Sequence, residues 1–240
     1  MELSDFIDIH SHILPGLDDG PEVLAESLAL LRCYSGVGVK RVFATPHFLP
    51  GTAWSASPRR IMAFVEGLRE VLPAHGINLE IISGMEIAIQ KNMGKNLARG
   101  RYLPLGESDI FLLEPPFKSA TFNPLEPLKE FTRQGKRVIL AHPERSEYFQ
   151  RNPQTLQQAH RNGIAIQINY GSLLGYFGAA SEKTAKQLVA WEVVDYLASD
   201  AHSAVNRRPP GGLEWHDLQK LITPEMLRQI ASVNPGKILT

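Results

Sequence analysis

Short apolar runs rich in β-branched residues alternate along the chain with longer amphipathic segments. Seven of the short runs are predicted strands, over Phe6–His12, Arg41–Pro46, Leu79–Met85, Ile110–Glu114, Arg137–His142, Ala165–Asn169 and Tyr196–Ser199. The longer segments are predicted helices, over Glu22–Tyr34, Pro58–His75, Asn123–Gln134, Pro153–Arg161, Ser181–Trp191, Gly212–Leu221 and Pro224–Val233. This alternation predicts parallel strands joined by right-handed crossover connections.

The predicted fold class is α/β. Seven strands that follow one another without a break in the pattern favour a closed barrel, a variant of the (β/α)8 type, over an open doubly wound sheet. No shift in composition marks a boundary, and no internal repeat or long linker appears. We therefore expect residues 1–240 to form a single domain.

His10 and His12 lie one residue apart at the end of the first predicted strand, between Ile9 and Ile13. Side chains at positions i and i+2 of a strand point to the same side, so both imidazoles face one place. Such a pair suits a metal ion, because imidazole is a common metal ligand. H-x-H alone fits a pair of hydrogen-bonded core histidines about as well, and only the rest of the chain favours the metal.

Five other predicted strands also lead into histidine or acidic residues, namely His47, Glu86, Glu114, His142, and Asp200 with His202. In an α/β barrel the C-terminal strand ends meet at one rim, which holds the active site. With one of Asp18 and Asp19, enough ligands are available for two or three ions bridged by carboxylates. The mixture of imidazole and carboxylate suits Zn, Mn, Fe or Co. Phosphoester hydrolysis is the expected reaction, and amide hydrolysis is the alternative.

The remaining histidines and the single cysteine are interpreted as structural. His75 and His160 fall near helix ends, and His216 falls in a late helix. Cys33 lies in the first amphipathic helix and is interpreted as a small core residue. A cysteine phosphatase needs an arginine six positions after its nucleophile, and the residue at that position is Val39. The sequence therefore argues against cysteine-based phosphatase chemistry.

The composition excludes several classes of protein. The 25 basic and 25 acidic residues balance, which argues against tight nucleic-acid binding, since this needs a basic surface. No apolar run approaches the roughly 18 residues of a membrane span, and the acidic N-terminus is unlike a signal peptide. A lone cysteine permits no internal disulfide. We expect a cytoplasmic protein that neither binds nucleic acid nor inserts into a membrane.

Seven short motifs occur in order along the chain: D-I-H-S-H, D-D-G, T-P-H, G-x-E, L-x-E-P, A-H-P-E-R and S-D-A-H. This set resembles the PHP (polymerase and histidinol phosphatase) superfamily. More narrowly, Asp8–Pro21, His142–Arg145 and Arg208–Pro210 resemble the CpsB/YwqE-type bacterial metal-dependent protein-tyrosine phosphatases, which are linked to capsule and exopolysaccharide synthesis. The resemblance extends from Ile7 to Leu239 and implies a distorted (β/α)7 TIM-like barrel of the PHP type.

The resemblance also implies three metal ions, each held by residues from different strand ends: His10, His12 and Asp200 for the first; Glu114 and His142 for the second; and His47, His202 and Asp19 for the third. Glu86 would bridge the first two ions, and Asp18 is the alternative to Asp19. Manganese is the favoured metal, and iron, zinc and cobalt are alternatives. The ions would activate a hydroxide that attacks phosphorus in line, and Asp200 also counts among the candidate catalytic residues.

Two arginines are implied to bind the substrate phosphate. Arg145 ends the A-H-P-E-R motif and matches a phosphate-binding arginine of the family. The second follows His202, where adjacency to Pro209 favours Arg208 and distance favours Arg207. We expect Arg208 to matter more than Arg207. A planar guanidinium can neutralise two phosphate oxygens at once as charge develops.

The implied activity is that of a protein-tyrosine phosphatase of non-cysteine type in capsule or exopolysaccharide synthesis. Its partner would be a phosphotyrosine-bearing protein, the tail of a bacterial tyrosine kinase, and copies of the chain would form a homo-oligomer. The alternatives are another PHP phosphoesterase, such as histidinol-phosphate phosphatase, and a non-catalytic metal-binding PHP module. Every expected ligand position is filled, which favours the enzyme over the module.

Overall fold

The computed structural model describes residues 1–240 and contains all seven predicted strands. They are β1 (Ile7–Ser11), β2 (Arg41–Ala44), β4 (Glu80–Ser83), β6 (Ile110–Glu114), β7 (Arg137–Ala141), β8 (Ala165–Asn169) and β9 (Tyr196–Ala198). Two further short strands, β3 (His47–Phe48) and β5 (Glu86–Ala88), continue the paths of β2 and β4 after a break of two residues. The predicted strands Arg41–Pro46 and Leu79–Met85 end just before β3 and β5, which the sequence does not predict.

The two breaks have different local causes. Pro46 lies between β2 and β3, and proline has no N–H to donate to a neighbouring strand. Gly84 lies between β4 and β5, where a Cβ atom would stand 2.8 Å from Cδ2 of Leu105 and 3.0 Å from Cγ2 of Thr45. The strands β3 and β5 that follow these breaks begin with His47 and Glu86.

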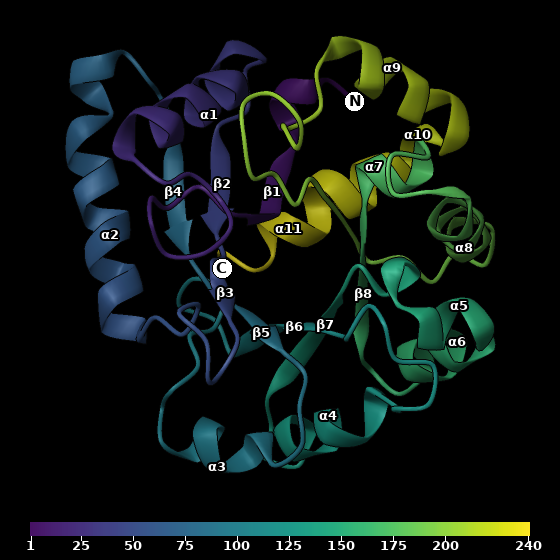
Figure 1. The fold of residues 1–240 in the computed structure, drawn as a ribbon. Coiled ribbons are helices and arrows are strands. Elements are labelled where there is room, and N and C mark those ends of the chain that lie inside the picture. The colour runs from purple at the N-terminus through teal and green to yellow at the C-terminus, as the bar shows by residue number, and fades with distance from the viewer.

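All strand pairs are parallel, as the βα alternation predicts. β1, β2 and β4 form one sheet, and β3, β5, β6, β7, β8 and β9 form the other, so the two broken strands lead from the first sheet into the second. After β9, the Asp200 amide donates to the His10 carbonyl (2.9 Å), and the His12 amide donates to the Ala201 carbonyl (2.8 Å). These bonds join the last strand path to the first. The strands follow a distorted (β/α)7 TIM-like barrel rather than an open sheet (Figure 1).

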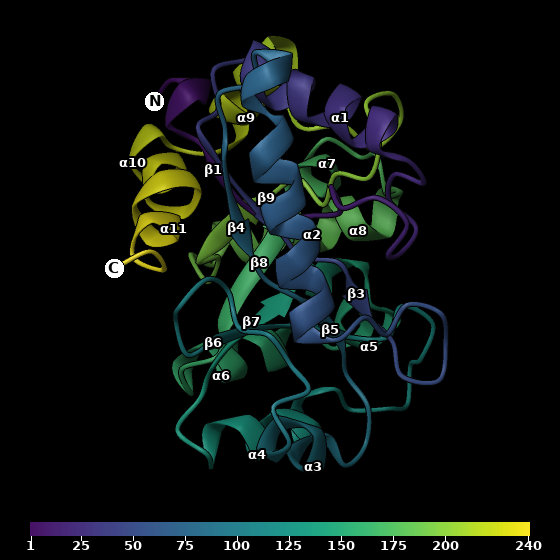
Figure 2. The same ribbon diagram turned by 90° about the vertical axis from the view of Figure 1, so that its left-hand side faces the viewer.

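Helices cover the outside of the strands. The α-helices are α1 (Leu24–Gly36), α2 (Pro58–Val71), α3 (Met93–Ala98), α4 (Leu125–Thr132), α5 (Glu147–Arg151), α6 (Gln154–Arg161), α7 (Tyr170–Leu173), α8 (Ala179–Ala190), α9 (Gly212–Leu221), α10 (Pro224–Arg228) and α11 (Asn234–Gly236). Three short 3-10 helices are η1 (Leu3–Asp5), η2 (Pro73–His75) and η3 (Pro143–Arg145), and η4 (Gln229–Val233) is a π-helical turn. In both ribbon views α1 and α2 flank β1, β2 and β4, whereas α3 and α4 lie at the far end, below β5 and β6 (Figures 1 and 2). None of the helices has both the length and the apolar character needed to cross a membrane.

Two predicted helices are divided in the structure. Pro58–His75 consists of α2 and η2, and Pro224–Val233 consists of α10 and η4. The short helices α3, α5, α7 and α11 are not predicted, because segments of three to six residues show no clear helical period. α2 begins where the sequence predicts it, since the Ser57 hydroxyl accepts a hydrogen bond from the Arg60 amide and Pro58 occupies the first turn.

Apolar side chains fill two regions. The larger lies between the strands and the helices and includes Ile166 and Ile168 of β8. The smaller is drawn from β1, β2, β4, β6, β7 and β9 and includes Ile9, Leu112 and Ile139. Side chains along a barrel strand point alternately outward and inward, so this smaller cluster packs the barrel interior. It forms an apolar floor beneath the rim where the strands end.

Candidate metal centre

His10 lies on β1 and His12 lies one residue after it, and the pairing of β1 with β2 is irregular between Asp8 and Ser11. Asp8 accepts a hydrogen bond from the Tyr34 hydroxyl of α1 (2.7 Å) and so faces the helix layer. His10 and His12 instead bring their Nε2 atoms within 3.2 Å of each other. Irregular pairing re-aims side chains beside active sites. Here it lets both imidazoles face one point although Asp8 does not.

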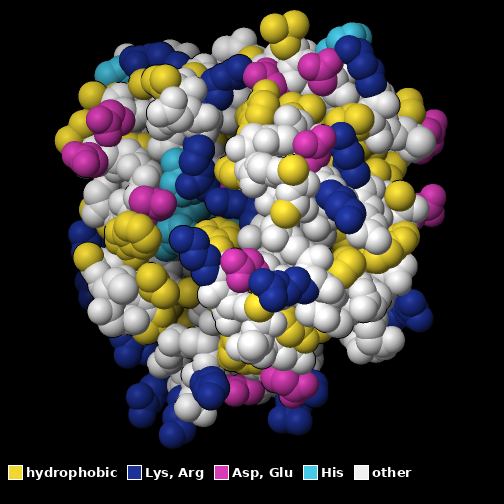
Figure 3. Space-filling model, turned by 45° about the vertical axis from the view of Figure 1, so that its right-hand side comes forward, with side chains coloured by type: hydrophobic (Ala, Val, Ile, Leu, Met, Phe, Trp, Pro, Cys, Tyr) yellow, Lys and Arg dark blue, Asp and Glu magenta, His cyan; other side chains and the backbone are white.

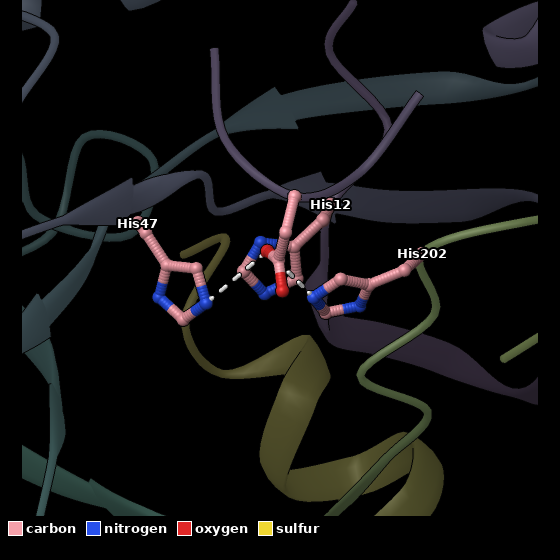
Figure 4. Close-up of side chains that lie close together, drawn as sticks. His12, His47 and His202 are labelled. Carbon is pink, nitrogen blue, oxygen red and sulfur yellow. Dashed lines mark ion pairs between the residues drawn. The ribbon is translucent and has the colours of Figure 1, made fainter. Parts of the chain in front are cut away.

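The nine sequence-predicted ligands come together at the rim formed by the strand ends. They form four overlapping groups, within each of which the ligand atoms lie within 4.8 Å of one another: His12, Asp19, His47 and His202; His10, Glu86 and His142; His10, His12 and Asp200; and His47, Glu86 and Glu114. Figure 4 shows the imidazoles of His12, His47 and His202 turned toward a shared point. Asp19 makes ion pairs with His47 (3.4 Å) and His202 (3.1 Å). Because the groups share residues, a single ligand can bridge neighbouring ions.

Glu86 occupies the middle of the site, at the start of β5. Its Oε2 lies 3.2 Å from Nε2 of both His10 and His12. The same oxygen lies 2.9 Å from Nδ1 of His47, and Oε1 lies 2.9 Å from Nε2 of His142. A carboxylate whose two oxygens face different imidazoles has the arrangement of a ligand that bridges two ions.

Three buried atoms of the candidate ligands, Oε2 of Glu86, Nδ1 of His142 and Nε2 of His202, make no hydrogen bond of good geometry within the protein. Glu86 and His202 have only ion-pair contacts with other candidate ligands at these atoms. Buried polar atoms usually have a hydrogen-bond partner, so three such atoms at one place point to a partner that the chain itself does not supply. Divalent transition-metal ions fit this donor set, because imidazole nitrogens and carboxylate oxygens are their usual ligands.

Asp18 and Asp19 have different surroundings. Asp18 Oδ2 accepts a hydrogen bond from Nδ1 of His12 (2.6 Å) and another from the first backbone amide of β3 (2.9 Å). This contact orients His12 with Nε2 toward the site. Asp19 instead pairs with His202 (3.1 Å). At Gly20 a Cβ atom would lie 2.6 Å from the His12 carbonyl oxygen, so the D-D-G motif supplies an orienting carboxylate, a candidate ligand and a residue without a side chain.

The pKa values of the centre reflect the close packing of four carboxylates and five imidazoles. Burial disfavours the charged form of His47, but the Glu86 carboxylate outweighs it and raises the pKa of His47 to about 9. Burial and the neighbouring Glu86 charge raise the pKa of Glu114 to about 8. Burial lowers the pKa of His142 to about 4. Bound cations would supply the positive charge that these carboxylates face.

Two candidate ligands hold the backbone in a region that non-glycine residues rarely adopt. The φ angle is +28° at His142, which follows β7, and +54° at Asp200, which follows β9. Such strain persists only where the surrounding structure enforces it, and it is concentrated at functional sites. In both places the turn directs a side chain toward the other ligands.

Asp200 also binds two arginines. Arg145 Nη1 and Arg207 Nη2 each donate to Oδ2 of Asp200 at 2.6 Å. Arg208 points elsewhere, because its guanidinium pairs with Glu214 of α9. The geometry thus favours Arg207 over Arg208 as the second arginine of the site, and which of the two binds phosphate stays a prediction. Sequence does not reveal which of two adjacent loop side chains turns inward.

Arg145 is held between two aromatic rings that the sequence does not single out. Its guanidinium carbon lies 4.5 Å from the ring centre of Phe117 and 4.2 Å from that of Phe177. Stacking of this kind fixes the plane of a guanidinium group. Arg145 is thus positioned before any substrate binds.

The centre opens to solvent through a hollow in the surface. Figure 3 shows histidine side chains at the bottom of this hollow and Lys or Arg side chains along its edge. A cavity of about 540 Å³ beside the centre has Asp19, His202 and Arg207 among its lining residues. This volume lies within the range of ordinary ligand pockets, so a phosphorylated side chain has room to enter.

The residues interpreted as structural lie outside the four ligand groups. His75 and His216 are exposed, and His160 pairs with Asp195 (3.3 Å). Cys33 is half-buried on α1 rather than fully enclosed, and burial raises the pKa of its thiol. A thiol with a raised pKa is a weak nucleophile.

Sequence reasoning missed two residues of β8 that contact candidate ligands. Gln167 Oε1 lies 3.0 Å from Nδ1 of His10, and Asn169 Nδ2 donates to Oδ2 of Asp200 (2.9 Å). Both side chains are fully buried. Their spacing in the strand equals that of His10 and His12, and this shared alternation is the signal that identifies them.

The chain is similar to known proteins over nearly its full length. The family model for capsular polysaccharide synthesis, CpsB/CapC, matches residues 6–240. The tyrosine-protein phosphatase YwqE of Bacillus subtilis (strain 168) is 32% identical over 201 residues, which cover 84% of this chain and 79% of YwqE.

Solved structures extend the comparison. One chain comes from the crystal structures of the metal-dependent tyrosine phosphatases YwqE from Bacillus subtilis and CpsB from Streptococcus pneumoniae. It superposes with a TM-score of 0.82 at 28% identity, over 97% of this chain and 91% of its own length. Histidinol phosphate phosphatase from Lactococcus lactis subsp. lactis superposes with a TM-score of 0.57 at 13% identity, over 91% of this chain and 92% of its own length. The second match shows a shared fold.

Proposed function

We propose that this chain, which belongs to the CpsB/CapC family of capsular polysaccharide synthesis and is a metal-dependent tyrosine phosphatase, acts on the phosphorylated tail of a bacterial tyrosine kinase. The match to the family over residues 6–240 supports a role in capsule or exopolysaccharide synthesis. A chain terminus is a suitable carrier of phosphotyrosine, because an extended segment can enter the hollow of Figure 3 without a fold of its own.

One observation carries the proposal: the candidate metal centre and two guanidinium groups meet at Asp200. Oδ1 of Asp200 lies 3.6 Å from Nε2 of His10 and 3.4 Å from Nε2 of His12. Oδ2 of the same carboxylate accepts hydrogen bonds from Arg145 and Arg207. A phosphate bound beside Asp200 would face metal ions on one side and N–H donors on the other.

The residues of the chain have separable roles in the proposed reaction. When bound, the metal ions supply a nucleophilic hydroxide near neutral pH and neutralise charge on the phosphate oxygens. Arg145 and Arg207 donate N–H groups to the remaining oxygens, and a guanidinium can bind two of them at once. The tyrosine leaves as a phenolate with a pKa of about 10, so its departure needs little help from an acid. We assign no general acid.

Aromatic surface beside the arginines supports phosphotyrosine as the substrate. Phe117 stacks on Arg145 and leaves 38% of its surface exposed. Tyr176 is 58% exposed and lines a cavity together with Arg207. Aromatic side chains bind a phenyl ring through their large apolar faces. They have no such contact with the short side chain of phosphoserine.

The finer features of the site are also proposals. We place three ions at the rim, with Glu86 between the first two, and favour manganese because four carboxylates belong to the ligand groups. A single half-buried cysteine supports a cytoplasmic location. Homo-oligomer formation rests on the family resemblance alone, and sedimentation of the purified chain tests it.

A substrate panel tests the proposed function. The chain would be stripped of metal, reconstituted with Mn, Zn or Fe, and assayed on a phosphotyrosine peptide, a phosphoserine peptide, p-nitrophenyl phosphate and histidinol phosphate. We expect the phosphotyrosine peptide to be hydrolysed in clear preference to the phosphoserine peptide and histidinol phosphate. Preference for histidinol phosphate would contradict the proposed substrate. Metal-loaded protein that releases no phosphate from any of the four would contradict the enzyme.

A further inference from the structure

β8 is the strand path of the barrel that ends in amides instead of histidine or acidic residues. Gln167 and Asn169 alternate along it with Ile166 and Ile168. The two isoleucines belong to the core between strands and helices, so the two amides face the barrel interior. Both amides are fully buried, and both contact candidate metal ligands.

The amides form one continuous chain of hydrogen bonds. Oε1 of Gln167 lies 3.0 Å from Nδ1 of His10. Nε2 of Gln167 donates to Oδ1 of Asn169 (2.8 Å), and Nδ2 of Asn169 donates to Oδ2 of Asp200 (2.9 Å). At the two ends, Nε2 of His10 and Oδ1 of Asp200 lie 3.6 Å apart within one candidate metal group. This series of hydrogen bonds therefore begins and ends at candidate ligands of the same ion.

We propose that Gln167 and Asn169 are positioning residues, which hold His10 and Asp200 in the state and orientation that bind metal. This inference rests on the metal centre of the proposed function. His10 must carry its proton on Nδ1 if Nε2 is to bind an ion, and the Gln167 oxygen accepts that N–H. Asn169 binds Oδ2 of Asp200 and leaves Oδ1 directed at the ion.

His10 and Asp200, at the two ends of the hydrogen-bond series, determine which way the oxygen and the NH2 group of each amide point. Because Gln167 turns its oxygen to His10, its NH2 group faces Asn169, which must present its own oxygen. Asn169 then has its NH2 group left for Asp200, whose ionised carboxylate accepts. Reversal of either amide would place two donors or two acceptors against each other.

Neutral amides also suit the charge of the centre. Four carboxylates already belong to the ligand groups. An acid at position 167 or 169 would add a buried negative charge beside Asp200, which is costly. A histidine there would offer a further metal ligand instead of a fixed hydrogen bond. Amides can orient two ligands without changing the charge or the ligand number.

Asn169 is anchored from a second side. Its backbone N–H donates to Oε1 of Glu144 (3.0 Å), an oxygen that also accepts the Ser172 hydroxyl (2.6 Å). Glu144 stands between His142 and Arg145 in the A-H-P-E-R motif. The acid of this motif therefore supports the end of β8, while His142 and Arg145 of the same motif face the centre.

A measurement of metal affinity distinguishes residues that position the ligands from residues that only stabilise the fold. The metal-free chain would be titrated with Mn²⁺ in competition with a chromophoric chelator, and its thermal unfolding would be followed without metal. Gln167→Met and Asn169→Leu keep the approximate shape of the side chains and remove their hydrogen bonds. Loss of an outer hydrogen-bond partner weakens metal binding by about 10- to 100-fold, and we expect losses in that range from a chain that still folds.

Three further variants sharpen the test. Gln167→Asn keeps a neutral amide but is one methylene shorter, so it should also lose metal affinity although the polarity of the side chain is kept. In the double variant Gln167→Met with Asn169→Leu, the two losses should not multiply, because either change interrupts the same chain. Ile168→Val is the matched control on the opposite face of β8. It should shift thermal unfolding and leave metal affinity unchanged.

The outcomes separate the inference from the proposed function. Parent-like metal affinity in the Gln167 and Asn169 variants overturns the positioning role and leaves the metal centre standing. A parent chain that binds no metal overturns both. If the apolar variants fail to fold, Gln167→Asn and Asn169→Ser, which stay polar and neutral but are too short to span the same contacts, decide the matter by the same affinity measurement.

Discussion

The path of β1 and strand β8 each present two polar side chains, one residue apart, to the candidate metal centre. His10 on β1 and His12 just after it bring their Nε2 atoms among the carboxylates of the centre. On β8 the two side chains are Gln167 and Asn169, which contact His10 and Asp200 at atoms that face away from that point. One strand provides ligands, and the other provides hydrogen bonds that orient ligands.

The difference follows from the chemistry of the side chains. A neutral imidazole has a nitrogen lone pair for a metal ion and an N–H for a second partner, whereas an amide links a donor to an acceptor at no net charge. Residues that hold ions, residues that hold ligands and residues that hold substrate should therefore respond differently to substitution. Metal content, metal affinity and turnover distinguish the three.

The largest effect should come from the ligands themselves. His10→Ala and Asp200→Ala each remove a member of the ligand group that includes His12, and we expect both variants to lose bound metal and phosphatase turnover together. Elemental analysis of the purified proteins and hydrolysis of p-nitrophenyl phosphate measure the two quantities. A His10→Ala protein with full metal content and activity would contradict the assignment of His10 as a metal ligand, and with it the difference in role between β1 and β8.

Arg145 should separate metal binding from catalysis. Removal of a charged contact to the transition state costs about 2–4 kcal/mol, which corresponds to roughly 10²- to 10³-fold in rate. Arg145→Ala should lose turnover to that extent and keep its metal. Arg145→Lys should recover part of the rate, because an ammonium is a point charge without the planar fork. Normal turnover of a phosphotyrosine peptide by Arg145→Ala would mean that the ions alone recognise phosphate.

The neighbouring arginines should differ from each other. Arg207 bonds to Asp200 but is 32% exposed, against 16% for Arg145, so Arg207→Ala should lower turnover by a smaller factor of roughly 10 to 100. Arg208→Ala should leave turnover nearly unchanged and remove a partly exposed pair with Glu214 that contributes at most about 1 kcal/mol to stability. Steady-state rates of the two single variants decide the order, and a larger loss in Arg208→Ala would reverse it.

Cys33 should have the smallest effect. It lies on α1 outside the ligand groups, and its thiol has a raised pKa. Cys33→Ser should therefore leave turnover within a few-fold of the parent, with circular dichroism as the check on folding. A folded but inactive Cys33→Ser protein would place the nucleophile on sulfur and contradict the metal mechanism.

The fold was largely predictable because its signals are local. Short runs rich in apolar residues mark β6 and β8 at their observed bounds, and an amphipathic segment marks helix α9 at its bounds. The break between β4 and β5 was not predictable, because Gly84 is required there by contacts with residues distant in sequence, Leu105 and Thr45. A linear pattern carries no record of such contacts.

The candidate site was predictable to a different degree for each residue type. Histidine and acidic residues at strand ends are rare in a core, so the nine ligand candidates stand out in the sequence and the structure groups them. Gln167 and Asn169 do not stand out, because buried amides also serve ordinary hydrogen bonding. Phe117 and Phe177 read as apolar loop residues until Arg145 is seen between them.

Metal add-back to the stripped chain is the most direct test of the phosphatase centre. Phosphate release from a phosphotyrosine peptide would be followed as Mn²⁺ is added, and bound metal would be counted in the same samples. We predict no release without metal, and a rise that levels off at about two to three bound ions per chain. Full activity after exhaustive chelation, or activity that rises while no metal is bound, would contradict a reaction that depends on ions held at the rim.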